Sequence, residues 1–351
     1  MEKIKAGVIG ATGYAGLEIV RLLLSHPFVE VAAVSSVSFE GRAISEIYPQ
    51  LTGIFGETLA NDAAVADRCD VVFGSLPAGL SEPIARRCFD AGKLYIDMGA
   101  DFRLKNEADY KQWYGKDYAD PALHEAAVYC IPELHRARLA GAKLIGNPGC
   151  YPTSIALGLA PAVKAGAIDP ATLVIDSKSG ATGAGRGLAL NTHYTECNEA
   201  FAPYKVASHR HTPEIEQTLS ELAGREVRVT FVPHLLAVNR GIVSTMYANF
   251  MPGFDLAAVR VLYEGFYRGE EFVRVLPDGA AANLKNVKYS NYCHISLHAD
   301  AHTGRLIVVS TIDNMVKGAG RAGDPEYEYR ARARGGCGAP HYPARVLSMK
   351  E

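Results

Sequence analysis

Short apolar runs alternate with amphipathic stretches through the first half of the chain. The runs at 3–9, 29–34, 69–73, 94–97 and 143–146 each predict a buried strand. Between them, apolar residues recur at helical spacing after residue 16, and Ser81 is typical of the N-cap of a helix that ends near Phe89. This alternation predicts an α/β fold with a doubly wound parallel sheet, of the Rossmann type that binds dinucleotides. The polar, tyrosine-rich segment 109–121 predicts an irregular surface stretch.

The second half has a different pattern. Apolar positions at helical spacing predict helices at 152–165 and 255–268, whereas strand patterns dominate at 173–176, 227–232, 242–250, 291–297 and 306–312. Thr303-Gly304 indicates a hairpin turn between the last two strands. We therefore expect an α+β domain with a mixed or antiparallel sheet at 149–313, which supplies the substrate pocket and subunit contacts. The first domain would cover 1–148, with 314–319 returning to it.

Composition and charge exclude several classes of protein. The 351 residues are 48% hydrophobic and 21% charged, with a formal net charge of −2, which gives no electrostatic footprint for nucleic acid or for an anionic membrane. No apolar run approaches the roughly 18 residues of a membrane span, and the first residues lack a secretory apolar region, so we expect a cytoplasmic protein. Seven cysteines at irregular spacings, with no C-x-x-C pair, favour neither a disulfide framework nor a zinc ribbon.

A glycine-rich turn follows the first predicted strand and precedes a helix. Its G-x-x-G-x-x-G spacing lets the backbone approach a pyrophosphate at the helix N-terminus. We expect the cofactor to contact Gly10, Thr12, Gly13, Tyr14, Ala15 and Gly16. The second strand ends in Ser35-Ser36 where an NAD-preferring protein usually has an acidic residue, and Arg42 follows. These residues favour NADP(H) over NAD, although Glu40 is an alternative acceptor for the ribose hydroxyls.

Three further segments lie where a cofactor or an anion can bind. The turn with Ser75 and Pro77 follows a strand, where cofactors line open α/β sheets. The segment 177–187, which includes Ser179 and Gly180, is rich in glycine and leaves amides available to an anion or a carboxamide; a flexible surface loop is the alternative. Arg103 can hold a phosphate or carboxylate, or can pair with a nearby aspartate.

Cys150 follows a Pro-Gly turn and precedes the helix expected at 152–165. A thiolate is the form that attacks carbonyls, and the amides of a helix N-terminus favour its negative charge. This placement predicts a catalytic thiol. The alternative is a buried cysteine that acts as a small hydrophobic residue.

Two histidines, His209 and His211, stand just before a predicted helix that starts at Thr212-Pro213. They can supply acid/base chemistry or bind phosphate, they can be structural, or they can form a metal pair. No third ligand lies near them in sequence, so we predict no metal site.

Together these motifs resemble the N-acetyl-γ-glutamyl-phosphate reductase family of arginine biosynthesis. The resemblance runs from Gly7 to about Ala319 and includes the cysteine signature at 145–153, Asp101-Phe102-Arg103, Ser179-Gly180, the segment 209–214 and the segment 313–318. The chain departs from the family at Ser154, where glycine or alanine is usual. Several motifs in the same order are far more specific than any one of them.

The resemblance implies an NADP-dependent acyl-phosphate reductase. The Cys150 thiolate would attack N-acetyl-glutamyl phosphate, release phosphate and form a thioester that NADPH reduces to the semialdehyde. It further implies His209 as the acid/base residue, Arg103, His211 and Asn147 as substrate contacts, Asn314 as a cofactor contact, and a homo-oligomer, either dimer or tetramer. The alternatives are an aspartate-semialdehyde dehydrogenase, a carrier-protein-linked aminoadipyl phosphate reductase and a non-catalytic NADP-binding regulator.

The end of the chain departs from this pattern. Residues 320–351 are rich in arginine, glycine and proline and show no helical period, whereas the family continues with a helix that packs on the dinucleotide domain. Codons for Glu326-Tyr327-Glu328-Tyr329, read one base over, can spell the family's Gln-Asn-Met-Asn. We interpret this segment as the product of a frameshift near Ala319, in the gene or in its sequencing; a native tail is the alternative.

Overall fold

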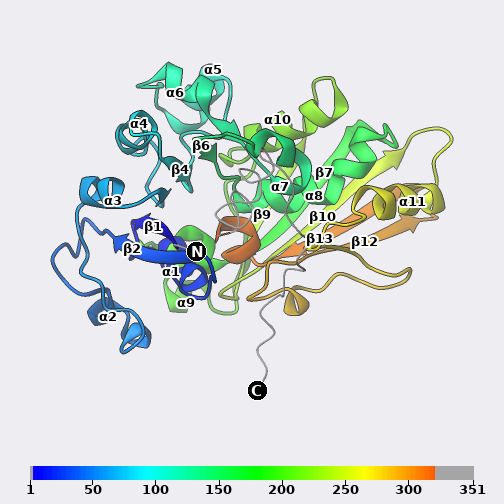
Figure 1. Cartoon of the computed structure of the whole chain (residues 1–351). Helices are drawn as coiled ribbons and strands as arrows, with labels where there is room; N and C mark the ends of the chain where they lie inside the picture. The colour runs from blue at the N-terminus through cyan, green and yellow to red at the C-terminus, as the bar shows by residue number, and fades with distance from the viewer. Residues whose placement is uncertain (1–2, 321–351) are drawn as a thin grey trace.

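The structure is a computed structural model that describes residues 3–320, and the interpretation of 321–351 lies outside this range. Figure 1 shows two sheets side by side, with helix α8 and the short orange segment at 316–320 between them. No helix within residues 3–320 is long and apolar enough to cross a membrane.

The first sheet has six strands that pair only in parallel, in the order β2-β1-β3-β4-β6-β5. These strands are β1 (Ile4–Ile9), β2 (Val29–Val34), β3 (Val71–Gly74), β4 (Leu94–Asp97), β5 (Val128–Tyr129) and β6 (Leu144–Gly146). Five of the six agree within two residues with the strands expected from the apolar runs. The two-residue strand β5 is too short to leave a sequence pattern.

Helices cover both faces of this sheet, as predicted. Ile19, Val20 and Leu23 of α1 (Tyr14–Leu24) pack into an apolar cluster on one face. α3 (Asp62–Arg68) and α4 (Glu82–Asp90) contribute to the cluster on the other face. Shorter helices fill the connections: α2 (Ile44–Ile47), η1 (Pro49–Leu51), α7 (Pro132–His135) and η2 (Arg136–Leu139).

The glycine-rich turn between β1 and α1 depends on two close approaches. Gly10 has φ +72°, and a Cβ there would lie 2.3 Å from the Ser75 carbonyl oxygen. A Cβ at Gly16 would lie 2.2 Å from the Gly10 carbonyl oxygen. Only glycine permits these contacts, which set the turn tightly against the carboxyl end of β3.

One expectation for the first domain was wrong. About half of the segment 109–121 is helical: α5 (Glu107–Tyr114) begins where the Asn106 side chain accepts from the Ala108 amide, and α6 (Pro121–Ala126) follows. Tyr110 of α5 is fully buried, so packing as well as capping stabilises this helix.

Ser81 is the N-cap residue of α4, as expected. Its hydroxyl does not accept from an amide of the helix; it donates to the buried Asp97 carboxylate at 2.6 Å.

The second sheet is mixed, as expected, with the order β11-β12-β13-β10-β7-β9-β8. Its strands are β7 (Ile168–Gly180), β8 (Phe201–Pro203), β9 (Thr230–Leu236), β10 (Ile242–Phe250), β11 (Val273–Val275), β12 (Cys293–Asp300) and β13 (Arg305–Ile312). β12 and β13 form the predicted antiparallel hairpin, with Gly304 in its turn at φ +69°. β7 is longer than expected and takes in the first four residues of the predicted loop 177–187.

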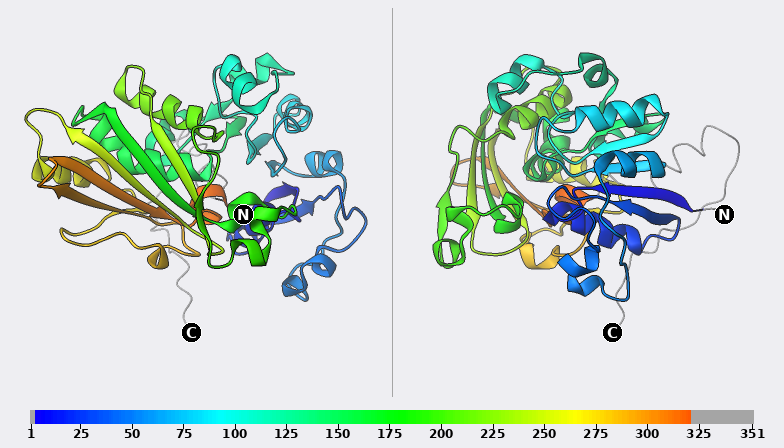
Figure 2. Two further views of the ribbon diagram at one scale, coloured as in Figure 1. Left: turned by 180° about the vertical axis from the view of Figure 1, so that it is seen from behind. Right: turned by 90° about the vertical axis from the view of Figure 1, so that its left-hand side faces the viewer.

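Three helices pack on this sheet: α8 (Cys150–Lys164), α10 (Thr212–Ala223) and α11 (Leu256–Phe266). They share one apolar core with its strands (Figure 2). α8 begins at Cys150 itself, two residues earlier than expected, with Gly149 as its N-cap, and the N-cap of α10 is His211 rather than Thr212. The loops contain η3 (Ala181–Ala184), η4 (Leu190–Thr192), α9 (Tyr194–Cys197) and η5 (Leu284–Asn286).

After β13 the chain returns to the junction of the two sheets. The segment η6 (Val316–Gly320) contacts both α8 and α1, and a Cβ at Gly318 would lie 2.7 Å from Cβ of Cys150. The domain boundary after residue 148 stays a prediction.

Candidate active site

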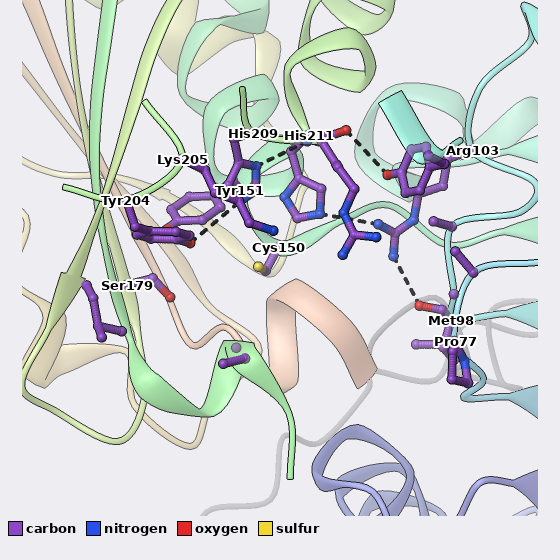
Figure 3. Close-up of a pocket in the computed structure, with 18 of the residues that line it drawn as sticks. Pro77, Met98, Arg103, Cys150, Tyr151, Ser179, Tyr204, Lys205, His209 and His211 are labelled. Carbon is purple, nitrogen blue, oxygen red and sulfur yellow. Dashed lines mark hydrogen bonds between the residues drawn. The ribbon is translucent and has the colours of Figure 1, made fainter. Parts of the chain in front are cut away.

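A cavity of about 500 Å³ lies where the two sheets meet. Its walls come from the turns after β3 and β4, from the start of α8, from the end of β7 and from the segment before α10. In Figure 3 the Cys150 thiol lies below the imidazoles of His209 and His211, with Arg103 on one side and Ser179 on the other. The sequence motifs that carry the predicted chemistry thus meet in one place.

Cys150 is the first residue of α8, and the backbone amides of Cys150 and Tyr151 at the helix start act to lower the pKa of its thiol. Burial nevertheless raises the pKa of the Cys150 thiol to about 11, and the Arg103 charge and these amides only partly oppose it. The amides at the helix start favour the thiolate, as expected, but the larger effect of desolvation acts against it.

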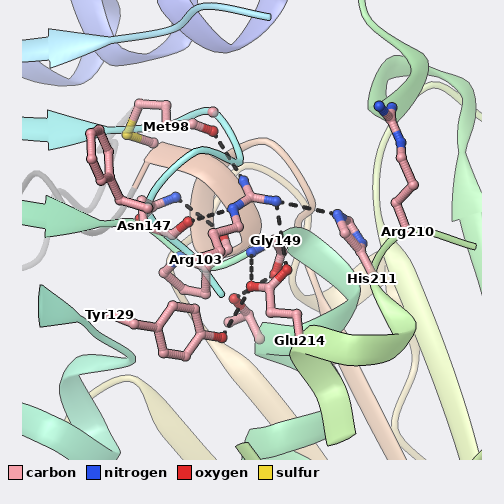
Figure 4. A network of polar contacts seen from close by, with 12 residues as sticks. Met98, Arg103, Tyr129, Asn147, Gly149, Arg210, His211 and Glu214 are labelled. Atoms are coloured by element: carbon pink, nitrogen blue, oxygen red, sulfur yellow. Dashed lines mark hydrogen bonds and ion pairs between the residues drawn. The ribbon is translucent and has the colours of Figure 1, made fainter. Parts of the chain in front are cut away.

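The turn before the thiol is held by Glu214 of α10, a fully buried residue. Its Oε1 accepts from the Gly149 amide at 2.7 Å and from the Tyr129 hydroxyl at 3.0 Å (Figure 4). Burial raises the pKa of the Glu214 carboxyl, while the Arg103 charge acts against this. Sequence analysis gave Glu214 no role, because a contact across 65 residues leaves no local signal.

Arg103 is the cation nearest to this turn. Its Nε donates to the Asn147 carbonyl oxygen at 2.8 Å and its Nη2 to the Met98 carbonyl oxygen at 3.0 Å. Its Nη1 lies 3.6 Å from Glu214 Oε2. The guanidinium thus pairs with Glu214 and not with an aspartate of its own turn, and it borders the cavity beside the thiol (Figure 4).

Hydrogen bonding assigns the proton on His209. Nδ1 of His209 accepts from the His211 backbone N–H at 3.1 Å, so the neutral ring carries its proton on Nε2. Nε2 lies 3.5 Å from the Tyr204 hydroxyl, which donates to the Tyr151 hydroxyl at 3.0 Å. Burial, with the charges of Lys205 and Arg210, lowers the pKa of His209 to about 4.

His211 has the opposite tautomer. Arg103 can only donate, so His211 Nε2, at 3.4 Å from Arg103 Nη1, is the acceptor and the proton is on Nδ1. Nδ1 is buried and has no hydrogen-bond partner among the described residues. Burial and the charges around it hold the pKa of His211 well below 6.5. Both rings are therefore neutral at pH 7.

The cavity is strongly cationic. Arg103, Lys205 and Arg210 line it, and no aspartate or glutamate of residues 3–320 does so. Tyr114 of α5 also lines it, with its hydroxyl donating to the Arg210 carbonyl oxygen at 3.3 Å, so the segment left without a role in the sequence borders the site. Sequence analysis missed Lys205, which stands in a loop without any motif. Such a lining favours a substrate that carries two or more negative charges.

Pro77, Ser179 and Gly180, which the sequence predicts as cofactor contacts, line the same cavity. The side chains of Asn147 and Asn314 do not line the cavity; they bond to the backbone and side chains around it. The Asn147 side chain donates to the carbonyl oxygens of Pro148 and Ala319, at 3.1 and 3.2 Å. The Asn314 side chain accepts from the Gly241 amide at 2.6 Å and donates to Thr182 Oγ1 at 3.1 Å.

The remaining predicted cofactor contacts cluster at the glycine-rich turn. Gly13 is the N-cap of α1 and has no side chain to accept from the first amides of the helix, and a Cβ at this position would meet only the Gly10 carbonyl oxygen, at 3.4 Å. Those amides are open to an anion, so the turn fits a dinucleotide pyrophosphate, next to Tyr14, Ala15 and Gly16.

The serines that end β2 are not equivalent. Ser36 Oγ lies 2.7 Å from Thr12 Oγ1, whereas Ser35 Oγ donates to Asp62 at 2.5 Å. Ser75 packs against Gly10. Arg42 Nε donates to Glu46 at 3.1 Å, so the charge proposed for a 2′-phosphate already has a carboxylate partner. Residues 3–320 contain no cluster of three or more histidine, cysteine, aspartate or glutamate side chains that can hold a metal ion.

A parallel dinucleotide-binding sheet, a mixed second sheet and a cysteine–histidine cavity between them define a semialdehyde dehydrogenase. Residues 5–142 match the family model described as semialdehyde dehydrogenase, NAD binding domain, and residues 150–314 match semialdehyde dehydrogenase, dimerisation domain. Solved structures with this fold include an aspartate semialdehyde dehydrogenase II from Vibrio cholerae (TM-score 0.69, 15% identity, covering 94% of this chain and 97% of that chain). Another is an aspartate semialdehyde dehydrogenase with NADP from Candida albicans (TM-score 0.68, 18% identity, 94% and 99%).

Curated relatives narrow the class. The N-acetyl-gamma-glutamyl-phosphate reductase of Brachyspira hyodysenteriae is 59% identical over 90% of this chain and 92% of its own length, and that of Clostridium beijerinckii is 55% identical over the same shares. The enzyme of this name from Moorella thermoacetica is 51% identical over 90% and 92%. The chain belongs to the N-acetyl-gamma-glutamyl-phosphate reductase family.

Proposed function

We propose that Cys150 is the nucleophile through which this chain carries out the N-acetyl-gamma-glutamyl-phosphate reductase reaction of arginine biosynthesis. The observation that carries the assignment is the position of the thiol: it is the first residue of α8, it borders the cavity, and the other walls supply three cations and no carboxylate among the described residues. An acyl phosphate with a free carboxylate matches that charge.

The first half of the reaction transfers the acyl group to sulfur. The Cys150 sulfur bonds to the acyl carbon, the bond between that carbon and the phosphate oxygen breaks, and the thiol proton leaves with the phosphate. Burial raises the pKa of the thiol to about 11, so the sulfur carries a proton before the reaction. The departing phosphate is itself the base that takes this proton. Arg103, held by two carbonyl groups, stabilises the negative charge of the phosphate.

The second half reduces the thioester. The dinucleotide cofactor supplies a hydride to the thioester carbon. His209, neutral and with its proton on Nε2, donates a hydrogen bond to the oxygen on which negative charge develops. Collapse of this intermediate breaks the carbon–sulfur bond, releases the aldehyde and leaves a thiolate that takes one proton from solvent. His211 and Asn147 orient Arg103, the former by its ring and the latter by its carbonyl group.

We further propose that the cofactor is NADP(H). The first domain belongs to an NAD-binding family, and two features of its residues support the 2′-phosphorylated form. β2 is followed by serines rather than by an acidic residue, and Ser36 lies 2.7 Å from Thr12 of the glycine-rich turn. Asn314 and the Ser179-Gly180 pair shape the loop expected beside the nicotinamide.

Replacing the thiol tests the proposal. We expect Cys150→Ser to lower turnover by at least about 1,000-fold, because an alkoxide is far harder to form than a thiolate, while adenine dinucleotide binding stays within a factor of two or so. In the absence of cofactor, the wild-type enzyme should release about one phosphate per site on mixing with the acyl phosphate, and the variant none. The matched control is Cys197→Ser, a partly exposed thiol outside the cavity lining, which should keep both properties. Phosphate release by Cys150→Ser would contradict the assignment.

A further inference from the structure

Arg186 lies in the second domain's glycine-rich loop but makes its contacts with the first domain. Its Nη1 donates to the Thr12 carbonyl oxygen at 3.1 Å and to the Tyr48 hydroxyl at 3.3 Å. The Tyr48 hydroxyl donates to the same Thr12 oxygen at 2.8 Å. The loop just after β7 and η3 therefore reaches across to the glycine-rich turn that precedes α1.

Two aromatic rings hold the guanidinium in place. The Arg186 Cζ lies 5.2 Å from the centroid of the Tyr48 ring and 5.5 Å from that of Phe39. Such cation–π contacts orient an arginine without neutralising its charge. The side chain is exposed, and no carboxylate of residues 3–320 pairs with it. Arg42, the nearby arginine that sequence analysis assigned to the cofactor, differs in pairing with Glu46.

Arg186 has hydrogen-bond donors that these contacts do not use, so it can bind a further ligand. An arginine has five N–H donors in a planar fork, and the hydrogen bonds above use Nη1 alone. Nε and Nη2 have no hydrogen-bond partner within the described part of the chain. A phosphate group is the ligand that such a fork binds with two parallel hydrogen bonds.

The position of the Arg186 guanidinium indicates which phosphate group of the dinucleotide it binds. Thr12, whose carbonyl oxygen receives Arg186, has its hydroxyl 2.7 Å from Ser36 Oγ at the end of β2. In dinucleotide-binding sheets, residues at the end of the second strand lie beside the 2′ position of the adenosine ribose, whereas the pyrophosphate lies at the helix N-terminus. Arg186 and Ser36 both contact Thr12, so the Arg186 guanidinium lies at the ribose end of the turn, where Ser36 offers a hydroxyl.

We propose that Arg186 binds the 2′-phosphate of NADP(H), so that a residue of the second domain distinguishes NADP(H) from NAD(H). This inference rests on the proposed use of NADP(H) and adds the residue that selects it. Gly183 and Ala184 line the cavity and belong to the same loop as Arg186. Binding of the 2′-phosphate by Arg186 therefore holds this part of the cavity lining against the first domain.

Binding of nucleotide fragments tests this without catalysis. Calorimetry should show that adenosine 2′,5′-bisphosphate binds Arg186→Gln about 10- to 100-fold more weakly than wild type, since one charged bidentate pair is lost. Adenosine 5′-monophosphate should bind both within about twofold. Arg186→Lys, which keeps the charge but not the fork, should fall between them. Arg274→Gln is the matched control and should keep the affinity for the bisphosphate, because Arg274 also lies over a tyrosine ring, that of Tyr292, but belongs to β11 and does not line the cavity.

Steady-state kinetics gives the second readout. In Arg186→Gln, kcat/KM for NADPH should fall by the same factor as the affinity for adenosine 2′,5′-bisphosphate, and kcat/KM for NADH should stay unchanged. An equal loss for the bisphosphate and the monophosphate, or no loss for either, would overturn the role of Arg186 while leaving a wild-type preference for NADPH intact. A wild-type enzyme that uses NADH and NADPH equally well would overturn both the cofactor proposal and this inference, and the phosphate-release test of Cys150 would be unaffected.

Discussion

At the scale of single residues, the site is defined by where protons reside. The His211 backbone amide fixes the tautomer of His209, and Arg103 fixes that of His211, so each imidazole has one assigned proton. Both rings are neutral because burial disfavours their charged forms. The neutral form of each imidazole is favoured beside Arg103, Lys205 and Arg210, because these three cations would repel a fourth or fifth positive charge in the cavity.

This protonation state predicts a dependence of stability on pH. His209 has a pKa of about 4 in the folded protein, against 6.5 in an unfolded chain. Its contribution to stability is therefore complete above pH 6.5 and is lost as the pH falls toward 4, by up to about 3 kcal/mol. Urea unfolding at pH 7.5 and pH 4.5 should show a smaller loss of unfolding free energy in His209→Gln than in wild type. Nuclear magnetic resonance titration of His209 with a midpoint near 6.5 would contradict this.

At the scale of elements, η6 is the piece that completes the site. Lys317 and Glu133 form an ion pair with almost no exposed side-chain surface, and the Lys317 ammonium lies 5.8 Å from the centre of the Phe272 ring. The next residue, Gly318, packs on Cys150, so the buried pair sets how closely η6 approaches the thiol. Removing one partner of a buried pair takes away an opposite charge that the other partner faces in a low dielectric.

We therefore expect Lys317→Met to reduce the unfolding free energy by about 3–5 kcal/mol. The double variant Lys317→Met/Glu133→Gln should recover much of this loss, because it removes both charges. Lys111→Met is the control: Lys111 and Asp117 form a well-exposed pair, and its loss should change the denaturation midpoint little. A Lys317→Met variant as stable as the control variant would contradict the role given to the buried pair.

Elements with a strong local signal were predictable, and the contacts between them were not. The apolar patterns predicted β2 and β10 residue for residue, because apolar side chains recur along each strand and alternate, at least in part, with more exposed positions. The helix α5 was missed, since its stability comes from a buried Tyr110 and an asparagine cap within a polar sequence. The thiol, both histidines and Arg103 were predicted from motifs, whereas Glu214, Lys205 and Arg186 act through contacts between distant segments.

At the scale of the whole molecule, we propose that the protein is a homo-oligomer, a dimer or a tetramer. Its second domain matches a dimerisation-domain family. Several large apolar side chains are exposed on one stretch of the monomer around β8, an edge strand of the mixed sheet: Leu188, Leu190, Tyr194, Phe201 and Val206. A patch of this kind marks a protein–protein contact.

Sedimentation measurements check the assembly. At about 10 μM the wild-type enzyme should sediment as a dimer or tetramer, since an apolar interface is favoured by burial. Phe201→Glu, which puts a charge on the edge strand, should shift the protein toward monomer without unfolding it. A wild-type protein that sediments as a monomer at this concentration would contradict the proposal.

The contact between Gly318 and Cys150 has a consequence for synthesis. Cys150, the proposed nucleophile, stands before the middle of the 351-residue chain, and the segment that covers it is made 168 residues later (318 − 150). The thiol, the helix that carries it and every strand of the second sheet are therefore synthesised before the covering segment. Until residue 318 emerges from the ribosome, the Cys150 thiol of the nascent chain lacks the backbone that covers it in the folded protein.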